Sequence, residues 1–151
     1  MPVIDETVVI ARPPGEVFDF LMLAENLPRW DSSMLECAQI GDGAVTVGTR
    51  YRGASKILGR RIEWVTVTEV VELVPGVRAV SRSVAGPLSF TVSYEVSASP
   101  AGTALRYRLA ADSGLDGAFG RAMEPIVQRA QTKVVRANLG TLASLLEQNA
   151  A

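Results

Sequence analysis

Three tyrosines and one glutamate are the polar side chains of this sequence best suited to chemistry. Histidine is absent from the 151 residues, and Cys37 is the single cysteine. This composition excludes Ser-His-Asp and Cys-His catalysis, histidine general bases and the usual zinc sites. The candidates that remain are the phenols of Tyr51, Tyr94 and Tyr107 and the carboxylate of Glu63. A phenol can polarise a ligand carbonyl, and a buried carboxylate can act as a general base.

Alternating strands are expected to position the tyrosines. In Leu88–Ser97 apolar and polar residues alternate, and Tyr94 falls on the apolar face. Thr103–Ala111 repeats the pattern with Tyr107 on its apolar face. We therefore expect these two phenols to face the interior from neighbouring strands, and Tyr51 could face the same interior. Each hydroxyl then either serves a ligand or is satisfied by a carbonyl or a water inside the core.

The direction of Glu63 is open. If it points inward with Val65 and Val67, burial raises its pKa toward working pH, as a general base requires. If Trp64 points inward instead, Glu63 lies outside and pairs with an arginine at little energetic consequence.

Other polar groups are expected to be structural. Cys37 has no evident basic neighbourhood, which favours a buried, inert thiol. Basic side chains on two strands predict a solvated convex face with cross-strand ion pairs. They are Arg50, Arg52 and Lys56 on one strand and Arg106 and Arg108 on another.

Short turns connect the strands into an antiparallel meander. The remaining strands are predicted at Val3–Ala11, Leu35–Ile40, Thr49–Ile57, Arg61–Val71 and Val77–Val84. After the first strand we expect a short helix over Glu16–Leu23 and a second short helix or turn that carries Trp30. A sheet with one apolar face must cover that face.

A long helix from Leu115 to Leu146 is the element large enough to cover it. Asp112-Ser113 and Gly114 are predicted to begin the helix, and Pro125 to kink it. The predicted sheet-facing stripe is Leu115, Phe119, Met123, Ile126, Ala130, Val134, Ala137, Thr141 and Leu145. A second, offset apolar line either packs inside the chain near the short helices or forms a dimer seam. This offset line is Val135, Leu139, Leu142 and Leu146.

Composition indicates one globular domain over residues 1–151, with 48% apolar and 21% charged residues. A net charge of −1 gives no attraction to nucleic acid or to an anionic membrane. No apolar run approaches the ~20 residues of a membrane span, and no signal peptide is evident. We therefore expect a soluble, cytoplasmic protein with no stable membrane insertion, as a monomer or a homodimer.

The order and spacing of several short motifs resemble the START-like (SRPBCC) superfamily, within it the polyketide cyclase/dehydrase branch. The resemblance runs through nearly the whole chain, although Leu23 departs from an aspartate that relatives often carry nearby. The motifs are Ile10-Ala11-Arg12-Pro13-Pro14-Gly15-Glu16-Val17-Phe18, Asn26-Leu27-Pro28-Arg29-Trp30, Val47-Gly48-Thr49, Gly59-Arg60-Arg61-Ile62-Glu63-Trp64, Gly86-Pro87, Gly102-Thr103 and Pro125.

This resemblance implies an α+β helix-grip fold, a seven-stranded antiparallel sheet wrapped around the long C-terminal helix with two short helices after the first strand. It also implies a hydrophobic cavity between sheet and helix. The expected lining is Trp30, Tyr51, Phe90, Val92, Tyr94, Tyr107, Phe119 and Met123. Two functions follow: binding of a lipid, polyketide or aromatic metabolite, or polyketide cyclase, dehydrase or aromatase chemistry by Tyr94, Tyr107, Tyr51 and Glu63. We expect neither a cofactor nor a metal, and whether the protein is an enzyme stays open.

Overall fold

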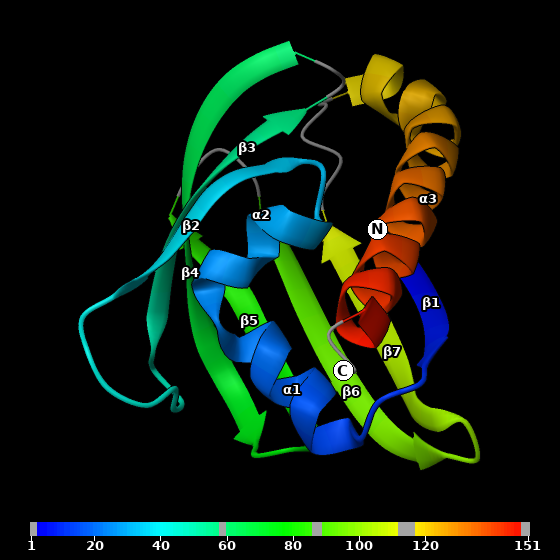
Figure 1. Ribbon diagram of the computed structural model, residues 1–151. Coiled ribbons are helices and arrows are strands. Elements are labelled where there is room, and N and C mark those ends of the chain that lie inside the picture. Colours follow the sequence, from blue (N-terminus) through cyan, green and yellow to red (C-terminus); the bar gives the residue numbers. More distant parts are fainter. Residues whose placement is uncertain (1–2, 58–59, 86–88, 112–116, 149–151) are drawn as a thin grey trace.

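A curled sheet of seven strands carries the helices of the described chain on one of its sides (Figure 1). The computed structural model describes residues 3–57, 60–85, 89–111 and 117–148, and the side chains of residues 55–66 and 111–128 lie outside that description. The helical elements are α1 (Pro14–Met22), the 3-10 turn η1 (Ala24–Asn26), α2 (Leu27–Trp30) and α3 (Gly117–Gln148). The strands are β1 (Val3–Ile10), β2 (Met34–Ile40), β3 (Arg50–Ile57), β4 (Arg60–Val74), β5 (Arg78–Ala85), β6 (Phe90–Ser99) and β7 (Gly102–Ala111). The predicted helix-grip α+β fold is confirmed.

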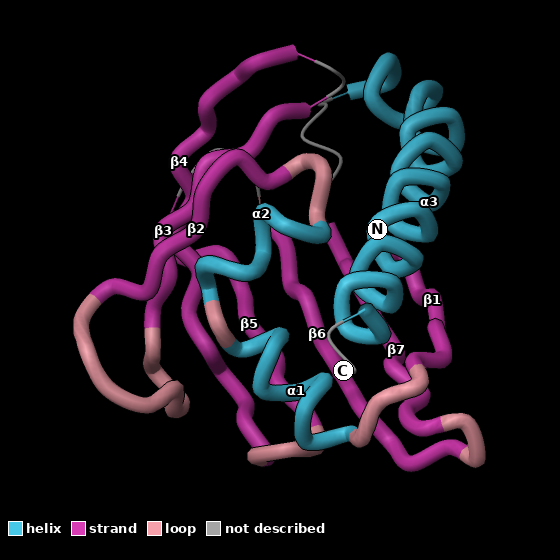
Figure 2. Tube along the Cα trace, viewed as in Figure 1, coloured by secondary structure: helices cyan, strands magenta, loops and turns pink. Residues whose placement is uncertain are grey.

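The strands β2 to β7 form a meander, and β1 pairs with β7 and is one edge of the sheet. Its order is β1-β7-β6-β5-β4-β3-β2, and every neighbouring pair is antiparallel. Register shifts interrupt the β2–β3, β3–β4 and β4–β5 pairings. Because irregularities of this kind bend and twist strands, they account for the curl that Figure 2 shows.

The predicted strands are confirmed with small shifts at their ends. The largest shift is in β4, which continues to Val74 where the sequence pattern predicts an end at Val71. A turn at Pro75-Gly76 then ends the strand, and Gly76 adopts a φ of 76°, a conformation that glycine tolerates best.

Two short helical segments bring Trp30 over the sheet. α1 begins at Pro14, which needs no hydrogen-bonding N–H in the first turn, and it buries Val17 and Phe18. The turn after α1 is held by Asn26, whose side-chain Nδ2 donates a 3.2 Å hydrogen bond to the carbonyl oxygen of Phe20. α2 follows directly and ends with Trp30 buried.

The buried face of α3 differs from the predicted stripe. Within the described side chains of that stripe, Ala130, Val134, Ala137 and Thr141 are exposed, and Leu145 is half-buried. The offset line of Val135, Leu139, Leu142 and Leu146 is buried instead, with Leu142 wholly inaccessible. The two lines lie one residue apart, about 100° around the helix, and the line of larger side chains removes more apolar surface from water.

The offset line packs inside the chain, in one cluster with Ile4, Ile10, Val17 and Phe18. The intrachain alternative is therefore correct for these four residues, and the dimer-seam alternative is wrong. The predicted helix start at Asp112-Ser113 and Gly114 lies outside the described residues. The side chains of Leu115, Phe119, Met123, Ile126 and the kink residue Pro125 also lie outside the described part.

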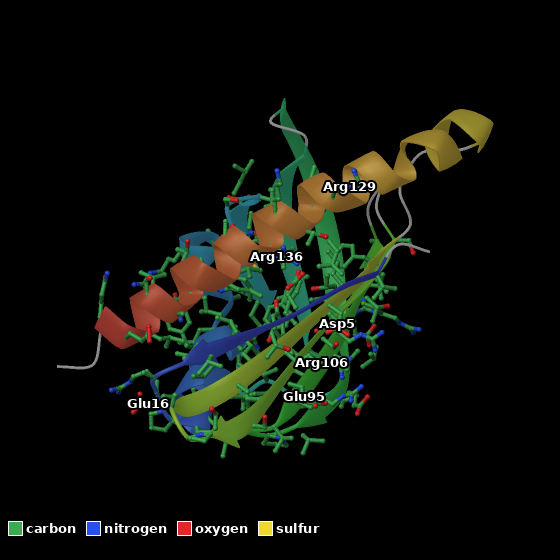
Figure 3. The ribbon with its side chains drawn as sticks, turned by 90° about the vertical axis from the view of Figure 1, so that its right-hand side faces the viewer. Asp5, Glu16, Glu95, Arg106, Arg129 and Arg136 are labelled. Atoms are coloured by element: carbon green, nitrogen blue, oxygen red, sulfur yellow. The ribbon has the colours of Figure 1, made fainter. Side chains whose placement is uncertain are left out.

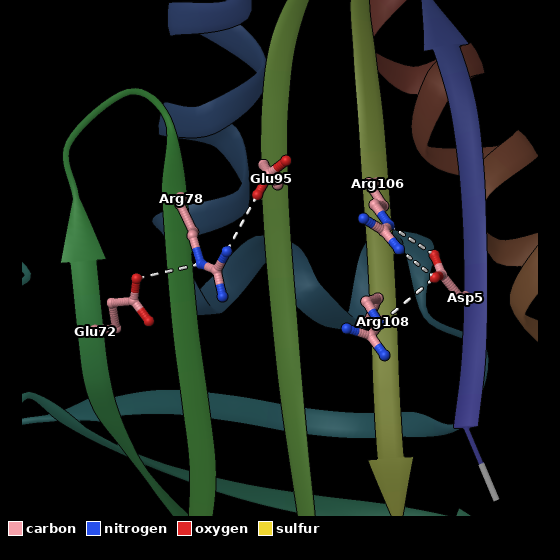
Figure 4. A network of polar contacts seen from close by, with 6 residues as sticks. All are labelled: Asp5, Glu72, Arg78, Glu95, Arg106 and Arg108. Atoms are coloured by element: carbon pink, nitrogen blue, oxygen red, sulfur yellow. Dashed lines mark hydrogen bonds and ion pairs between the residues drawn. The ribbon is translucent and has the colours of Figure 1, made fainter.

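The convex face of the sheet carries a row of ion pairs, as predicted. Figure 4 shows Arg78 between two carboxylates, with nitrogen–oxygen distances of 3.3 Å to Glu72 and 3.2 Å to Glu95. On the neighbouring strands Arg106 reaches Asp5 at 2.6 Å, and this hydrogen bond lowers the pKa of the Asp5 carboxyl. Other members are Arg108–Asp5 and Arg50–Glu69. A separate ion pair, Arg136–Glu6, joins α3 to β1 on the inner face, where Glu6 is the direct partner of Tyr107; Figure 3 labels Arg136 on α3.

A close approach of two chain segments joins β1 to β7. The Thr103 hydroxyl donates a 2.6 Å hydrogen bond to the carbonyl oxygen of Arg12, and Thr103 is fully buried. Gly102 adopts a φ of 135°, and a Cβ atom there would lie 2.5 Å from the carbonyl oxygen of Ile10. Glycine is therefore required at this position for steric as well as conformational reasons.

Candidate ligand-binding site

Three aromatic rings meet between α2 and the concave face of the sheet. Trp30 comes from α2, Tyr94 from β6 and Tyr107 from β7. The ring centroids of Trp30 lie 6.3 Å from Tyr94 and 6.5 Å from Tyr107, both in edge-to-face geometry. The two tyrosine centroids lie 5.6 Å apart. These distances and angles are those of attractive aromatic contacts, and we call the three residues the aromatic cluster.

Strand alternation and register explain why the phenols meet. Tyr94 and Tyr107 are direct cross-strand partners in the β6–β7 ladder, so their side chains leave the sheet on the same face. The next inward pair, Val96 with Leu105, is buried, while Arg106 and Arg108 are exposed on the opposite face. The predicted inward direction of both tyrosines is confirmed.

The environment keeps both phenols protonated. Desolvation is the main cause that raises the pKa of Tyr94 well above its usual value, with smaller contributions from Tyr107 and Asp31. Desolvation also raises the pKa of Tyr107, and Asp31 adds to it. At neutral pH both hydroxyls are therefore neutral hydrogen-bond donors, suited to a carbonyl or ether oxygen and unsuited to act as bases.

Tyr51 and Cys37 lie on the adjoining strands β3 and β2. Desolvation and the proximity of Cys37 raise the pKa of Tyr51 to about 12. Desolvation raises the pKa of the Cys37 thiol to about 11. Both groups also contribute to the raised pKa of Tyr94, so all three side chains lie within electrostatic reach of one another. The predicted inward direction of Tyr51 agrees with this, and Cys37 has the electrostatics of an unreactive thiol.

A polar network next to the aromatic cluster was not anticipated from the sequence. Asp31 Oδ1 accepts hydrogen bonds from the Ser33 backbone N–H at 3.0 Å, the Ser33 hydroxyl at 2.7 Å and Asn138 Nδ2 at 3.1 Å. Asn138 Oδ1 accepts a 3.2 Å hydrogen bond from the Ser32 N–H. The network ties the end of α2 to the middle of α3. One signal was available in the sequence, because Asn138 interrupts the apolar line that α3 buries.

The other predicted lining residues divide into two groups. Val92 packs against the core cluster, and Phe90 is half-buried near the start of β6, where its N–H donates to Ser83 Oγ at 2.9 Å. The side chains of Phe119 and Met123 lie outside the described part of the chain, as does that of Glu63, the candidate general base.

A groove of about 330 Å³ lies elsewhere, between α1 and the end of α3. Its walls include Phe20, Leu23 and Leu146, with Asp19 and the Arg12–Glu16 ion pair among its polar residues. None of the residues predicted to line a site belongs to it. In the described residues no three carboxylate or thiol groups come together as metal ligands, and no described helix has the length and apolarity needed to cross a bilayer.

Known proteins resemble this chain along its length. The family model for polyketide cyclase/dehydrase and lipid transport matches residues 1–147. No curated protein has a sequence that matches the chain.

Solved structures share the fold at low sequence identity. A protein of Thermus thermophilus superposes with a TM-score of 0.81 at 17% identity, covering 99% of this chain and 100% of its own. A START superfamily protein from Mycobacterium smegmatis gives 0.73 at 18% identity, covering 97% of each chain. The Zhui aromatase/cyclase from Streptomyces sp. R1128 gives 0.73 at 13% identity, covering 99% of this chain and 95% of its own. With the match over residues 1–147, the chain belongs to the polyketide cyclase/dehydrase and lipid transport family, and it shares its fold with these solved structures.

Proposed function

We propose that this protein is one START-like domain over residues 1–151 that binds a small hydrophobic molecule between its sheet and α3. The ligand classes are a lipid, a polyketide or an aromatic metabolite. The observation that carries the proposal is the aromatic cluster, in which two neutral phenols and an indole converge on the concave side of the sheet. The family's description, which joins cyclase, dehydrase and lipid transport proteins, supports the same range of ligands.

The chemistry of the cluster suits such a ligand. Aromatic rings offer a large apolar surface at a small cost in side-chain entropy, and an edge-to-face arrangement can accept a further ring or an acyl chain. The phenols supply the few polar contacts that orient a ligand in an otherwise apolar site. Tyr51, which lies near Tyr94, would extend the same polar edge.

Native mass spectrometry of the purified protein tests the proposal. We expect an adduct of defined mass that organic extraction removes, and we expect the extracted protein to take up a neutral naphthalene probe. Binding can be followed by Trp30 fluorescence in the Trp64→Phe variant. Tyr94→Phe should weaken binding by several-fold with little change in stability, whereas Arg106→Gln on the convex face should leave binding unchanged.

Two results would contradict the proposal. One is a protein without adduct that also fails to bind any neutral aromatic probe, and the other is a probe that binds without affecting Trp30 fluorescence. A large loss of stability in Tyr94→Phe, with unchanged binding, would assign Tyr94 to the core alone.

A second candidate function, enolisation chemistry, is favoured by the phenol pair. Two neutral donors on one face can stabilise the oxygen of an enolate as a carboxylate removes the adjacent proton, and Glu63 is the predicted base. The test is deuterium exchange of the methyl protons of 2-acetonaphthone, followed by NMR. Exchange faster than in buffer, and reduced in Tyr94→Phe, would support an enzyme, and binding without accelerated exchange would support a binding protein.

A further inference from the structure

The carboxylate of Asp31 is held in one orientation by its neighbours. All three hydrogen bonds that the described residues give it end on Oδ1, two from Ser33 and one from Asn138. Asn138 is itself buried, with 6% of its surface exposed, and is 107 residues away in the sequence. A second contact from the Ser32 N–H orients the Asn138 amide, so its Nδ2 must point toward Asp31. The rotation of the carboxylate is thereby restricted.

The other oxygen of the Asp31 carboxylate, Oδ2, takes no part in the contacts described above. None of these three hydrogen bonds from the described residues uses it, although an ionised carboxylate can accept several hydrogen bonds on each oxygen. Asp31 is half-buried and directly follows Trp30, a member of the aromatic cluster. Its negative charge also acts on the hydroxyls of Tyr94 and Tyr107. The carboxylate and the aromatic cluster therefore border the same region.

We propose that Asp31 Oδ2 is a hydrogen-bond acceptor of the ligand-binding site and selects hydrophobic ligands that carry a phenolic or alcoholic hydroxyl. This inference rests on the proposed binding function and adds the class of ligand. The tyrosines donate to ligand oxygens, and Asp31 accepts from a ligand hydroxyl. A ligand with a hydroxyl next to an aromatic or acyl framework satisfies both kinds of group. An ether of the same shape leaves the carboxylate without a donor, which is costly in a partly desolvated site.

The comparison of 2-naphthol with 2-methoxynaphthalene tests the inference, because the ether lacks the hydroxyl hydrogen that 2-naphthol donates. In the wild-type protein we expect 2-naphthol to bind about tenfold more tightly or better, as for a hydrogen bond to a charged acceptor. Binding is measured by Trp30 fluorescence in the Trp64→Phe background. A wild-type protein that binds both probes equally would overturn the inference and leave the proposed binding function intact.

Asp31→Asn is the variant that isolates the acceptor. The amide oxygen can replace Oδ1 toward Ser33 and Asn138, which places an NH2 donor where Oδ2 stood. We expect the preference for 2-naphthol to be lost, and we expect 2-acetonaphthone, which brings an acceptor, to bind more tightly than to the wild type. The matched control is Asp42→Asn, which removes one charge from an exposed loop and should keep the preference.

The outcomes separate the two proposals. Retention of the 2-naphthol preference in a folded Asp31→Asn protein would overturn the role of Asp31. Failure of the wild type to bind any of the three probes would overturn the proposed binding function and this inference with it. If Asp31→Asn does not fold, equal binding of the hydroxyl and the ether probes by the wild-type protein would still overturn the inference.

Discussion

Replacement of Leu142 by alanine should reveal which face of α3 holds the protein together. Leu142 is wholly inaccessible and packs in the cluster that includes Ile10, Val17 and Leu105. Leucine-to-alanine changes at such positions lose the transfer free energy of the removed methyl groups and leave a cavity, which together cost about 2–5 kcal/mol. We expect a loss of about 3 kcal/mol in the free energy of unfolding, or roughly 6–12 °C in Tm for a domain of this size.

The assay is urea unfolding followed by far-UV circular dichroism, with an unchanged denaturant slope as the check on two-state behaviour. Val134→Ala is the matched control, because Val134 belongs to the predicted stripe but is 36% exposed. We expect the control to stay within about 0.5 kcal/mol of the wild type. If Val134→Ala costs as much as Leu142→Ala, the assignment of the buried face is refuted.

Three further predictions concern a turn, a phenol and an ion pair. Gly102→Ala should destabilise the protein well beyond Gly76→Ala in urea unfolding, since Gly76 has open space around it and an alanine there costs only about 1–2 kcal/mol of backbone strain. Because the folded-state pKa of Tyr51 is raised from 10 to about 12, its contribution to stability is full below pH 10 and is lost as the pH rises to about 12. Tyr51→Phe should therefore lose less stability across that interval, which unfolding midpoints at both limits would check. Asp5→Asn, which breaks the exposed pair with Arg106, should cost little stability in low salt and nothing measurable in high salt, as thermal melts at the two ionic strengths would show.

Strand alternation correctly predicted the direction of two tyrosines because the phase of their strands is unambiguous. Apolar and polar residues alternate from Phe90 to Ser97 on β6 and from Leu105 to Leu109 on β7, so Tyr94 and Tyr107 could be assigned to the inner face from the sequence. Their meeting as direct partners follows from a tight turn at Ser99–Gly102, which sets the register. β4 offered no such alternation around Glu63.

The buried face of α3 was harder to predict from the sequence because two apolar lines lie side by side on this helix. Ala130, Ala137 and Thr141 continue the period of the bulkier residues that precede them, and the predicted stripe followed that period. Side-chain volume, larger at Leu139 and Leu142, would have favoured the line that the structure buries.

The Asp31–Asn138 contact could not be predicted by either kind of pattern. It depends on how α2 and α3 dock, which periodicity within one element does not describe. A polar residue within an apolar line indicates that a partner exists and leaves that partner unnamed.

The pairing of the first strand with the last also determines how the chain must fold. β1 finds its partner only after β7 has been made, and the Thr103–Arg12 hydrogen bond that joins the two regions spans 91 residues. At ribosomal rates of about 5–20 residues per second, β1 waits roughly 5–20 s with its apolar side chains unpaired. Contacts of such long sequence separation slow folding to milliseconds or longer after release. The β1 segment therefore stays without its partner strand through most of synthesis, and its docking is expected to be a late step.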